Sequence, residues 1–184
     1  MAGSHAVDWA ARRLVVEAEG SFEDVVARYE GAVPDYPAAR IEQLVADDAG
    51  WQAVCDLTDT VARHGFLIYW KIAADSLMRV AGDTSRCAAY LMGNHTIAER
   101  MFRHDPTAML YAPLRTVISQ EPGGPVLFST DQPSLHFASL GRPEITEVGI
   151  ELDHKLGALL AALGLPVPAC LNQPQPASTG TDQH

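Results

Sequence analysis

The stretch RCAAYLMGNHTIAERMFRH, residues 86–104, predicts a strand, a turn and a helix in direct succession. Residues 86–92 are mostly apolar and include an aromatic side chain, which is typical of a buried strand. Gly93 and Asn94 end this run, because both residue types favour turns. From His95 onward the apolar residues recur at helical spacing, until the Asp-Pro pair at 105–106 ends the helix.

Further strand signals lie on both sides of this unit. The segment FLIYWKI, residues 66–72, is β-branched and aromatic and has the strongest strand pattern in the chain. Downstream, residues 113–118 and 126–129 flank the turn sequence EPGGP, which predicts a β-hairpin. A short strand within residues 12–19 brings the expected sheet to about five strands.

The helices expected from the sequence fit a sheet of this kind. Ser21 is a predicted N-cap after the first strand, and residues 50–64 form a second amphipathic helix. The longest helix begins at Pro143 and has a continuous apolar stripe. Its members are Ile145, Val148, Leu152, Leu156, Leu159 and Leu163. We therefore expect a two-layer α+β fold, with a mainly antiparallel sheet of about five strands and helices packed on one face.

The chain of 184 residues is expected to hold one folded domain. Hydrophobic residues make up 47% of it, enough for a core that needs no disulfide or metal. Residues 12–164 form the predicted domain, and residues 1–11 an N-terminal extension. The segment 165–184 is rich in Pro, Gln, Ser and Thr and is expected to be a disordered tail.

Charge and cysteine content narrow the classes of function. The formal net charge of -10 argues against a nucleic-acid partner, which needs a basic surface. The three cysteines show neither zinc-site spacing nor a disulfide pattern, which favours a reducing, cytoplasmic location. We expect no membrane partner, because no apolar run reaches about 20 residues. An exposed sheet edge and the apolar content favour a homodimer.

Three motifs resemble one known family. They are YLMGNHTIAE at residues 90–99, HDP at 104–106 and APLRTVI at 112–118. Together they are similar to the core of the domain of unknown function 302 family, and the resemblance extends over residues 12–164. It implies a compact α+β fold, often dimeric, and no settled activity. This chain has His95 where the family often has proline, so the residue is of special interest.

His95 and Glu99 lie four residues apart on one helix face. They are candidates for a general base with an orienting carboxylate, or for two metal ligands. The alternative is that Glu99 only pairs with Arg103 in solvent. His136 lies in a loop bracketed by prolines and is a second catalytic candidate, at the mouth of a pocket.

A ligand site is expected near the strands. Arg115, at the start of a strand, could hold an anionic group with its guanidinium. Aromatic and methionine side chains near the strands could line a pocket for a flat apolar ligand, with core packing as the alternative. They are Tyr69, Tyr90, Met92, Tyr111 and Phe128.

Three functions remain open at this point. The first is binding of a small, largely apolar or aromatic metabolite, with a cofactor-independent acid–base step such as an isomerisation, cyclisation or lyase reaction. The second is a non-catalytic ligand sensor or dimeric interaction module. The third is a metal or haem protein that uses His95, His104 or His136. No cofactor is predicted. The first function requires the polar side chains of residues 93–103 and of the hairpin of Arg115 to border one shared apolar pocket.

Overall fold

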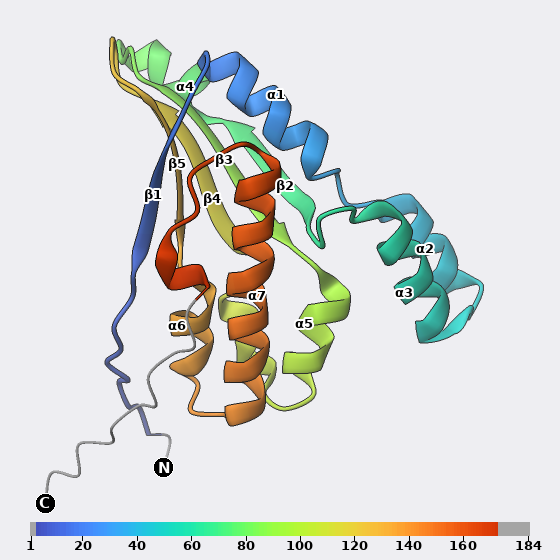
Figure 1. Cartoon of the computed structure of the whole chain (residues 1–184). Coiled ribbons are helices and arrows are strands. Elements are labelled where there is room, and N and C mark those ends of the chain that lie inside the picture. Colours follow the sequence, from blue (N-terminus) through green and yellow to red (C-terminus); the bar gives the residue numbers. More distant parts are fainter. Residues whose placement is uncertain (1–2, 173–184) are drawn as a thin grey trace, which may run out of the picture.

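The computed structural model describes residues 3–172 and has a five-stranded antiparallel sheet in the order β1-β5-β4-β3-β2 (Figure 1). The strands are β1 (Arg13–Ala18), β2 (Leu67–Ala73), β3 (Arg86–Gly93), β4 (Leu114–Gln120) and β5 (Val126–Asp131). All neighbouring strands pair in antiparallel register, and β4 and β5 form the hairpin expected from the sequence. The predicted α+β fold is confirmed.

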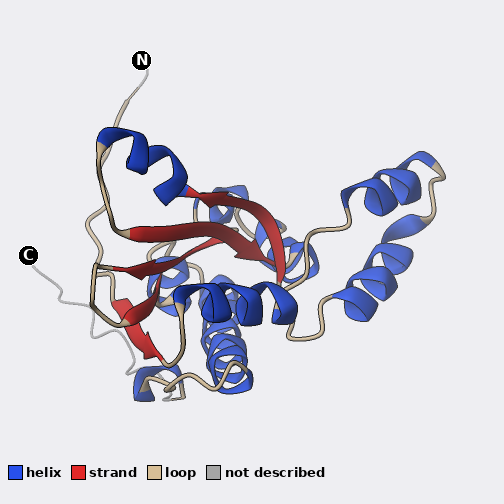
Figure 2. Ribbon diagram, turned by 90° about the horizontal axis from the view of Figure 1, so that it is seen from above, coloured by secondary structure: helices blue, strands red, loops and turns tan. Residues whose placement is uncertain are grey.

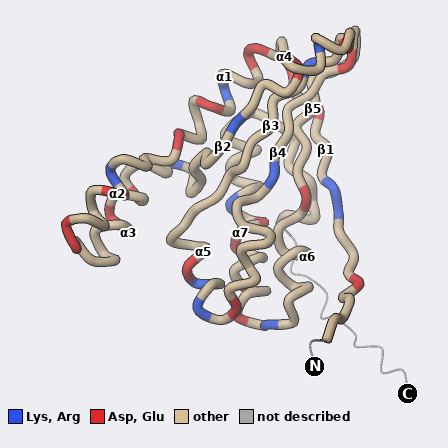
Figure 3. Tube along the Cα trace, turned by 180° about the vertical axis from the view of Figure 1, so that it is seen from behind, with Lys and Arg blue, Asp and Glu red and all other residues tan. Residues whose placement is uncertain are grey.

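The main helices lie on one face of this sheet. The helices are α1 (Phe22–Ala32), α2 (Ala38–Ala46), α3 (Gly50–Val61), α4 (Ala74–Met78), α5 (His95–Phe102), α6 (Pro133–Ala138) and α7 (Pro143–Ala162). Short 3-10 turns are η1 (Arg79–Ala81), η2 (Pro106–Leu110) and η3 (Ala169–Leu171). Seen from behind, the strands lie in front and α7 lies behind them, so the second face of the sheet is uncovered (Figure 3).

Strand alternation separates the two faces, because successive side chains point to opposite sides of a sheet. The side chains beneath the helices are buried: Ala88, Tyr90, Met92, Leu114, Thr116, Ile118, Val126, Phe128 and Thr130. The uncovered face carries exposed apolar side chains, among them Val15, Trp70 and Ile72.

Helices α6 and α7 pack closely because α7 has a glycine at their contact. A Cβ atom on Gly149 would lie 3.0 Å from the Cα of Ser134 and 3.0 Å from the Cβ of Phe137. Only a residue without a side chain allows the two helix backbones to approach this far. The contact brings Phe137 into the core beside the apolar stripe of α7.

Helices α2 and α3 form a helical hairpin that projects away from the sheet (Figure 2). Helix α2 has no buried residue among those described, whereas α3 buries Val54, Leu57 and Thr58. The hairpin is therefore attached to the domain mainly through α3.

The expected boundary at residue 164 is wrong for the part of the tail that the structure describes. Leu165 and Leu171 are buried in the main core, and Val167 packs against it. These apolar side chains are separated by prolines, so the helical and strand periodicities gave no sign of them. Residues 173–184 lie outside the described part of the chain, and the prediction for them is untested.

A buried carboxylate joins the start of β1 to α6 and α7. Asp153 on α7 accepts hydrogen bonds from the backbone N–H (2.9 Å) and the hydroxyl (2.6 Å) of Ser134. It also accepts one from the side-chain amide of Gln132 (2.6 Å), whose oxygen accepts one from Arg12 (2.8 Å). Burial raises the pKa of Asp153, and these hydrogen bonds oppose the rise.

We predict that Asp153→Ala lowers the free energy of unfolding by about 2–3 kcal/mol, because it removes the buried carboxylate that accepts three hydrogen bonds from Ser134 and Gln132. The neighbouring residue His154 is exposed, so His154→Ala should cost less than about 0.5 kcal/mol. Urea unfolding of the two variants measures both values. Equal losses would show that the cluster contributes nothing specific.

Candidate functional site

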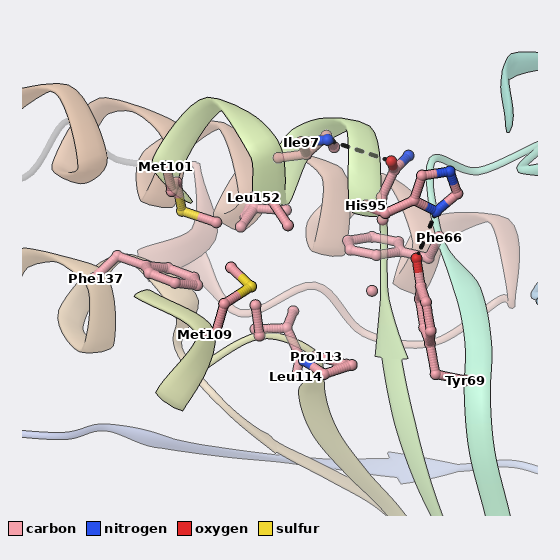
Figure 4. A pocket seen from close by; sticks show the side chains of 14 residues that line it. Phe66, Tyr69, His95, Ile97, Met101, Met109, Pro113, Leu114, Phe137 and Leu152 are labelled. Carbon is pink, nitrogen blue, oxygen red and sulfur yellow. Dashed lines mark hydrogen bonds between the residues drawn. The ribbon is translucent and has the colours of Figure 1, made fainter. Parts of the chain in front are cut away.

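An apolar pocket of about 190 Å³ lies where β3 ends and β4 begins. Its wall comes from the β3–α5 turn, α5, η2, the start of β4, α6 and α7. In the close-up, Met101 and Phe137 lie at one end, and Tyr69 and His95 lie at the other (Figure 4). None of the 14 lining residues is an acid, a lysine or an arginine.

The turn at Gly93 and Asn94 builds this pocket. A Cβ atom on Gly93 would lie 3.2 Å from the Cβ and 3.3 Å from the Cα of Pro113, so a side chain here would push the two strand ends apart. Asn94 is the N-cap of α5 and accepts hydrogen bonds from the backbone N–H groups of Thr96 (2.9 Å) and Ile97 (3.3 Å). Its side-chain amide donates to the carbonyl of Gly65 (3.1 Å). These bonds fix the first turn of α5.

His95 is held from both sides of its ring. Its Nε2 atom lies 2.7 Å from the hydroxyl of Thr58 on α3, and its Nδ1 atom lies 2.7 Å from the hydroxyl of Tyr69 on β2. The Thr58 hydroxyl donates to the carbonyl of Val54 (2.7 Å). Nε2 must therefore donate to Thr58, which leaves Nδ1 of the neutral ring to accept from Tyr69. The four residues form one hydrogen-bond chain with a defined direction.

Burial keeps both partners in this chain uncharged near neutral pH. It lowers the pKa of His95 from its ordinary value of 6.5 and raises the pKa of Tyr69. These hydrogen-bonded side chains can therefore transfer a proton between them, although none of them is charged in the resting state. If the Tyr69 oxygen takes a proton from a bound molecule, the phenolic proton can pass to Nδ1 of His95.

Tyr36 packs against Tyr69 and His95 and lines a second hollow. Its ring stacks on Tyr69 at 4.7 Å between ring centroids and meets His95 edge-on at 5.6 Å. The second hollow has a volume of about 440 Å³, lies between α2 and α3 and also borders His95. His95 thus borders both spaces, whereas Tyr69 lines only the pocket and Tyr36 only the second hollow.

The expected partnership of His95 and Glu99 is wrong. Glu99 instead forms an ion pair with Arg103 along the exposed side of α5, which is the alternative the spacing left open. Thr58 occupies the orienting position that Glu99 was expected to fill. It lies 37 residues before His95 on a different helix, so no local pattern pointed to it. Tyr36 was missed for the same reason.

The ligand-binding residues expected from the sequence are dispersed. Tyr69 lines the pocket. Met92 and Phe128 do not, since both point into the core with at most 1% of their surface exposed. The expectation that these two line a pocket is wrong. Tyr90 is buried against Tyr29, donates to Glu30 (3.1 Å) and borders a separate hollow beside α1.

Arg115 belongs to the opposite face of the sheet. Its neighbour Leu114 is buried and lines the pocket, so the next side chain along β4 points away. Residues 93–103 and the start of β4 border one apolar pocket, but β4 contributes Leu114 and not Arg115, so the expectation that polar side chains of both segments meet there is wrong. Arg115, Tyr111 and His136 instead line a small hollow of about 40 Å³.

The described residues do not support the hypothesis of a metal site. Between residues 3 and 172, no three or more His, Cys, Asp or Glu side chains come together in a way that could hold a metal ion. His104 is exposed at the end of α5, away from the pocket lining. Across the same residues, no helix is long and apolar enough to span a bilayer.

The family model for "Domain of unknown function DUF302" matches residues 50–163. The chain belongs to the DUF302 family. The match includes Thr58, Tyr69 and His95, and leaves out β1, α1 and α2. No curated protein matches the chain.

A solved structure supports the fold of this DUF302 protein. It is the crystal structure of an uncharacterized conserved DUF302 protein from Bacillus stearothermophilus, with a TM-score of 0.59 and 14% sequence identity. The alignment covers 82% of this chain and 97% of that chain. At this identity the likeness concerns the fold alone.

We predict that His95 titrates below 6.5 and carries its proton on Nε2 in the neutral form, as measured by ¹⁵N NMR. Because the folded pKa lies below the ordinary value, the folded chain binds fewer protons than the unfolded chain at acidic pH. The contribution of His95 to the free energy of unfolding should therefore be constant above pH 6.5 and should fall as the pH drops through the folded pKa. In His95→Gln this decline should be smaller.

Thr58→Val tests which ring nitrogen of His95 carries the proton, because valine has nearly the same shape as threonine but offers no acceptor to Nε2. We expect a loss of about 1–3 kcal/mol in the free energy of unfolding. If the tautomer of His95 and the stability of the protein are both unchanged in this variant, the proposed direction of the hydrogen bonds from Tyr69 through His95 to Thr58 is wrong.

Proposed function

We propose that this protein binds a small, uncharged, largely apolar molecule in the pocket between α5, η2 and the start of β4. The observation that carries the proposal is an apolar volume of about 190 Å³ at the end of a well-packed core. An apolar cavity of about 150 Å³ is large enough to bind benzene. The pocket therefore fits a molecule of about one six-membered ring with one or two small substituents.

The lining argues for a neutral ligand. An ion moved from water into an apolar site without a partner loses several kcal/mol of hydration free energy. The polar side chains in the wall already have partners, because Asn94 caps α5 and His95 is bonded to Thr58 and Tyr69. Shape and apolar contact would therefore dominate recognition, with Tyr69 and His95 at one end (Figure 4).

We predict that toluene, used as a probe, raises the thermal midpoint of the wild-type protein in a saturable way, because it binds only the folded chain. Each kcal/mol of stabilisation should shift the midpoint by roughly 2–4 °C. Ala98 lines the pocket, so Ala98→Phe should fill it and remove the shift.

The control variant is Ala161→Phe, which adds the same ring at an exposed position of α7. It should retain the full response to toluene. A wild-type midpoint that toluene leaves unchanged would refute ligand binding at this pocket.

The hydrogen bonds of Tyr69, His95 and Thr58 favour a further hypothesis. We propose that the protein also catalyses a cofactor-independent acid–base reaction on the bound molecule. In this proposal the Tyr69 oxygen exchanges a proton with the ligand and His95 holds the phenolic proton meanwhile, which is supported by their hydrogen bond and by their position in the pocket wall. This role replaces the expected His95–Glu99 pair with Tyr69 and His95. A reaction in which a proton leaves a carbon next to a carbonyl, as in an isomerisation, suits this arrangement.

We predict that the protein accelerates hydrogen–deuterium exchange at the carbons beside the carbonyl of cyclohexanone in D₂O, as followed by NMR. Tyr69→Phe and His95→Gln should each lower the protein-dependent rate by at least about tenfold, since general acid–base catalysis typically contributes a factor of 10²–10⁴. Tyr90→Phe removes a hydroxyl outside the pocket and should keep the rate.

These experiments separate the two functional classes. Binding of neutral ring compounds without any protein-dependent exchange would support a non-catalytic ligand sensor. The expected homodimer and cytoplasmic location remain predictions. The uncovered sheet face, with Val15, Trp70 and Ile72 exposed, is the surface we propose for a homodimer.

A further inference from the structure

A cluster of three rings lies outside the pocket, where the N-terminal segment passes the end of the sheet. The rings of Tyr111 and His136 are 4.9 Å apart between centroids. Trp9 contacts both of them, at 5.6 Å from Tyr111 and 4.5 Å from His136. The tryptophan nevertheless keeps 37% of its surface exposed. Tyr111 and His136 thus present an aromatic surface on which a third ring rests.

One nitrogen of this cluster has no partner. Within residues 3–172, Nδ1 of His136 is buried and makes no hydrogen bond. Its Nε2 atom faces the carboxylate of Asp131 at 3.6 Å, and Asp131 also faces Arg13 at 3.7 Å. Buried polar atoms are rarely left unpaired, and such an atom often marks a place for a ligand or water.

The positively charged side chain of Arg115 belongs to the same part of the structure. Arg115 lines the small hollow together with Tyr111, Asp131 and His136. In the described part of the chain its guanidinium forms no ion pair and no hydrogen bond. An unpaired guanidinium beside aromatic rings recognises a planar anion, because it can donate two parallel hydrogen bonds to a carboxylate.

The segment that carries Trp9 is weakly attached. Residues 3–11 are exposed and make no hydrogen bond to the rest of the described chain. The first anchor is Arg12, whose carbonyl accepts from the backbone N–H of Gln132 (2.8 Å). Ring contacts of Trp9 therefore hold the segment in place, and a competing ring can displace it.

We propose that Tyr111, His136 and Arg115 form a second binding site, for a planar aromatic molecule that carries a carboxylate, and that Trp9 occupies its ring position in the free protein. The hollow of about 40 Å³ has room for water but not for a ring while Trp9 is in place. A ligand ring takes the place of the indole, and its carboxylate binds Arg115. Pro113 and Leu114 border both the hollow and the apolar pocket, but Tyr111, His136 and Arg115 line the hollow alone, and the proposal does not rest on the function proposed for the pocket.

The test is calorimetric titration of indole-3-acetate into the full chain, with 3-methylindole as the uncharged comparison. Trp9→Ala removes the competitor and should tighten binding of indole-3-acetate roughly tenfold, the effect of one good aromatic contact. Trp51→Ala is the matched control, because it removes a tryptophan of similar exposure (47%) from α3. It should bind like the wild type.

Two variants in the Trp9→Ala background locate the ligand. Arg115→Gln should reduce the affinity for indole-3-acetate to that for 3-methylindole. Ala98→Phe fills the apolar pocket and should leave the affinity for indole-3-acetate unchanged. The proposal is overturned if Trp9→Ala binds no more tightly than Trp51→Ala, if Arg115→Gln has no effect, or if Ala98→Phe abolishes binding.

Discussion

The hydrogen bonds of a single side chain, Asn94, hold together the elements that create the pocket. Its oxygen caps α5, and its amide donates to Gly65 in the loop that leads into β2. The end of β3, the start of α5 and the start of β2 are thereby fixed to one another. Because His95 follows directly, the cap also decides where the imidazole lies. The nitrogens of that ring then meet side chains from β2 and α3.

The resulting pocket combines an apolar wall with internally satisfied polar groups. A buried hydroxyl or imidazole without a partner would cost free energy in the empty protein. Tyr69, His95 and Thr58 avoid this cost because each is bonded to the next. The polar groups at the edge of the pocket therefore carry no penalty for an unpaired donor or acceptor. The same chain connects the pocket to the helical hairpin, since Thr58 lies on α3 and Tyr36 covers both rings.

Local patterns in the sequence predicted the elements well. The strand–turn–helix at residues 86–104, the β4–β5 hairpin and the apolar stripe of α7 all follow from spacing and turn chemistry within one segment. The contacts of His95 could not be predicted in this way, because Thr58 and Tyr69 reach it from other elements. The buried carboxylate of Asp153 was missed for the same reason, as its partners Gln132 and Ser134 lie at the start of α6.

The orientation of Arg115 was within reach of the sequence. Leu114 and Arg115 are consecutive in a strand with one covered face, so an inward Leu114 requires an outward Arg115. The strand period therefore places Arg115 outside the apolar pocket that Leu114 lines. The prediction that Met92 and Phe128 line a pocket failed for another reason. An inward side chain can fill either the core or a pocket, and only the packing decides between them.

The central claim is that the space beside α5 is a real apolar cavity that accepts a neutral guest. Xenon tests this most directly, because it binds empty apolar cavities without needing any polar contact. In a crystal of the protein pressurised with xenon, we expect an anomalous peak between Met101, Met109 and Leu114. A pocket closed by the methionine side chains, with no xenon bound there, would contradict the account.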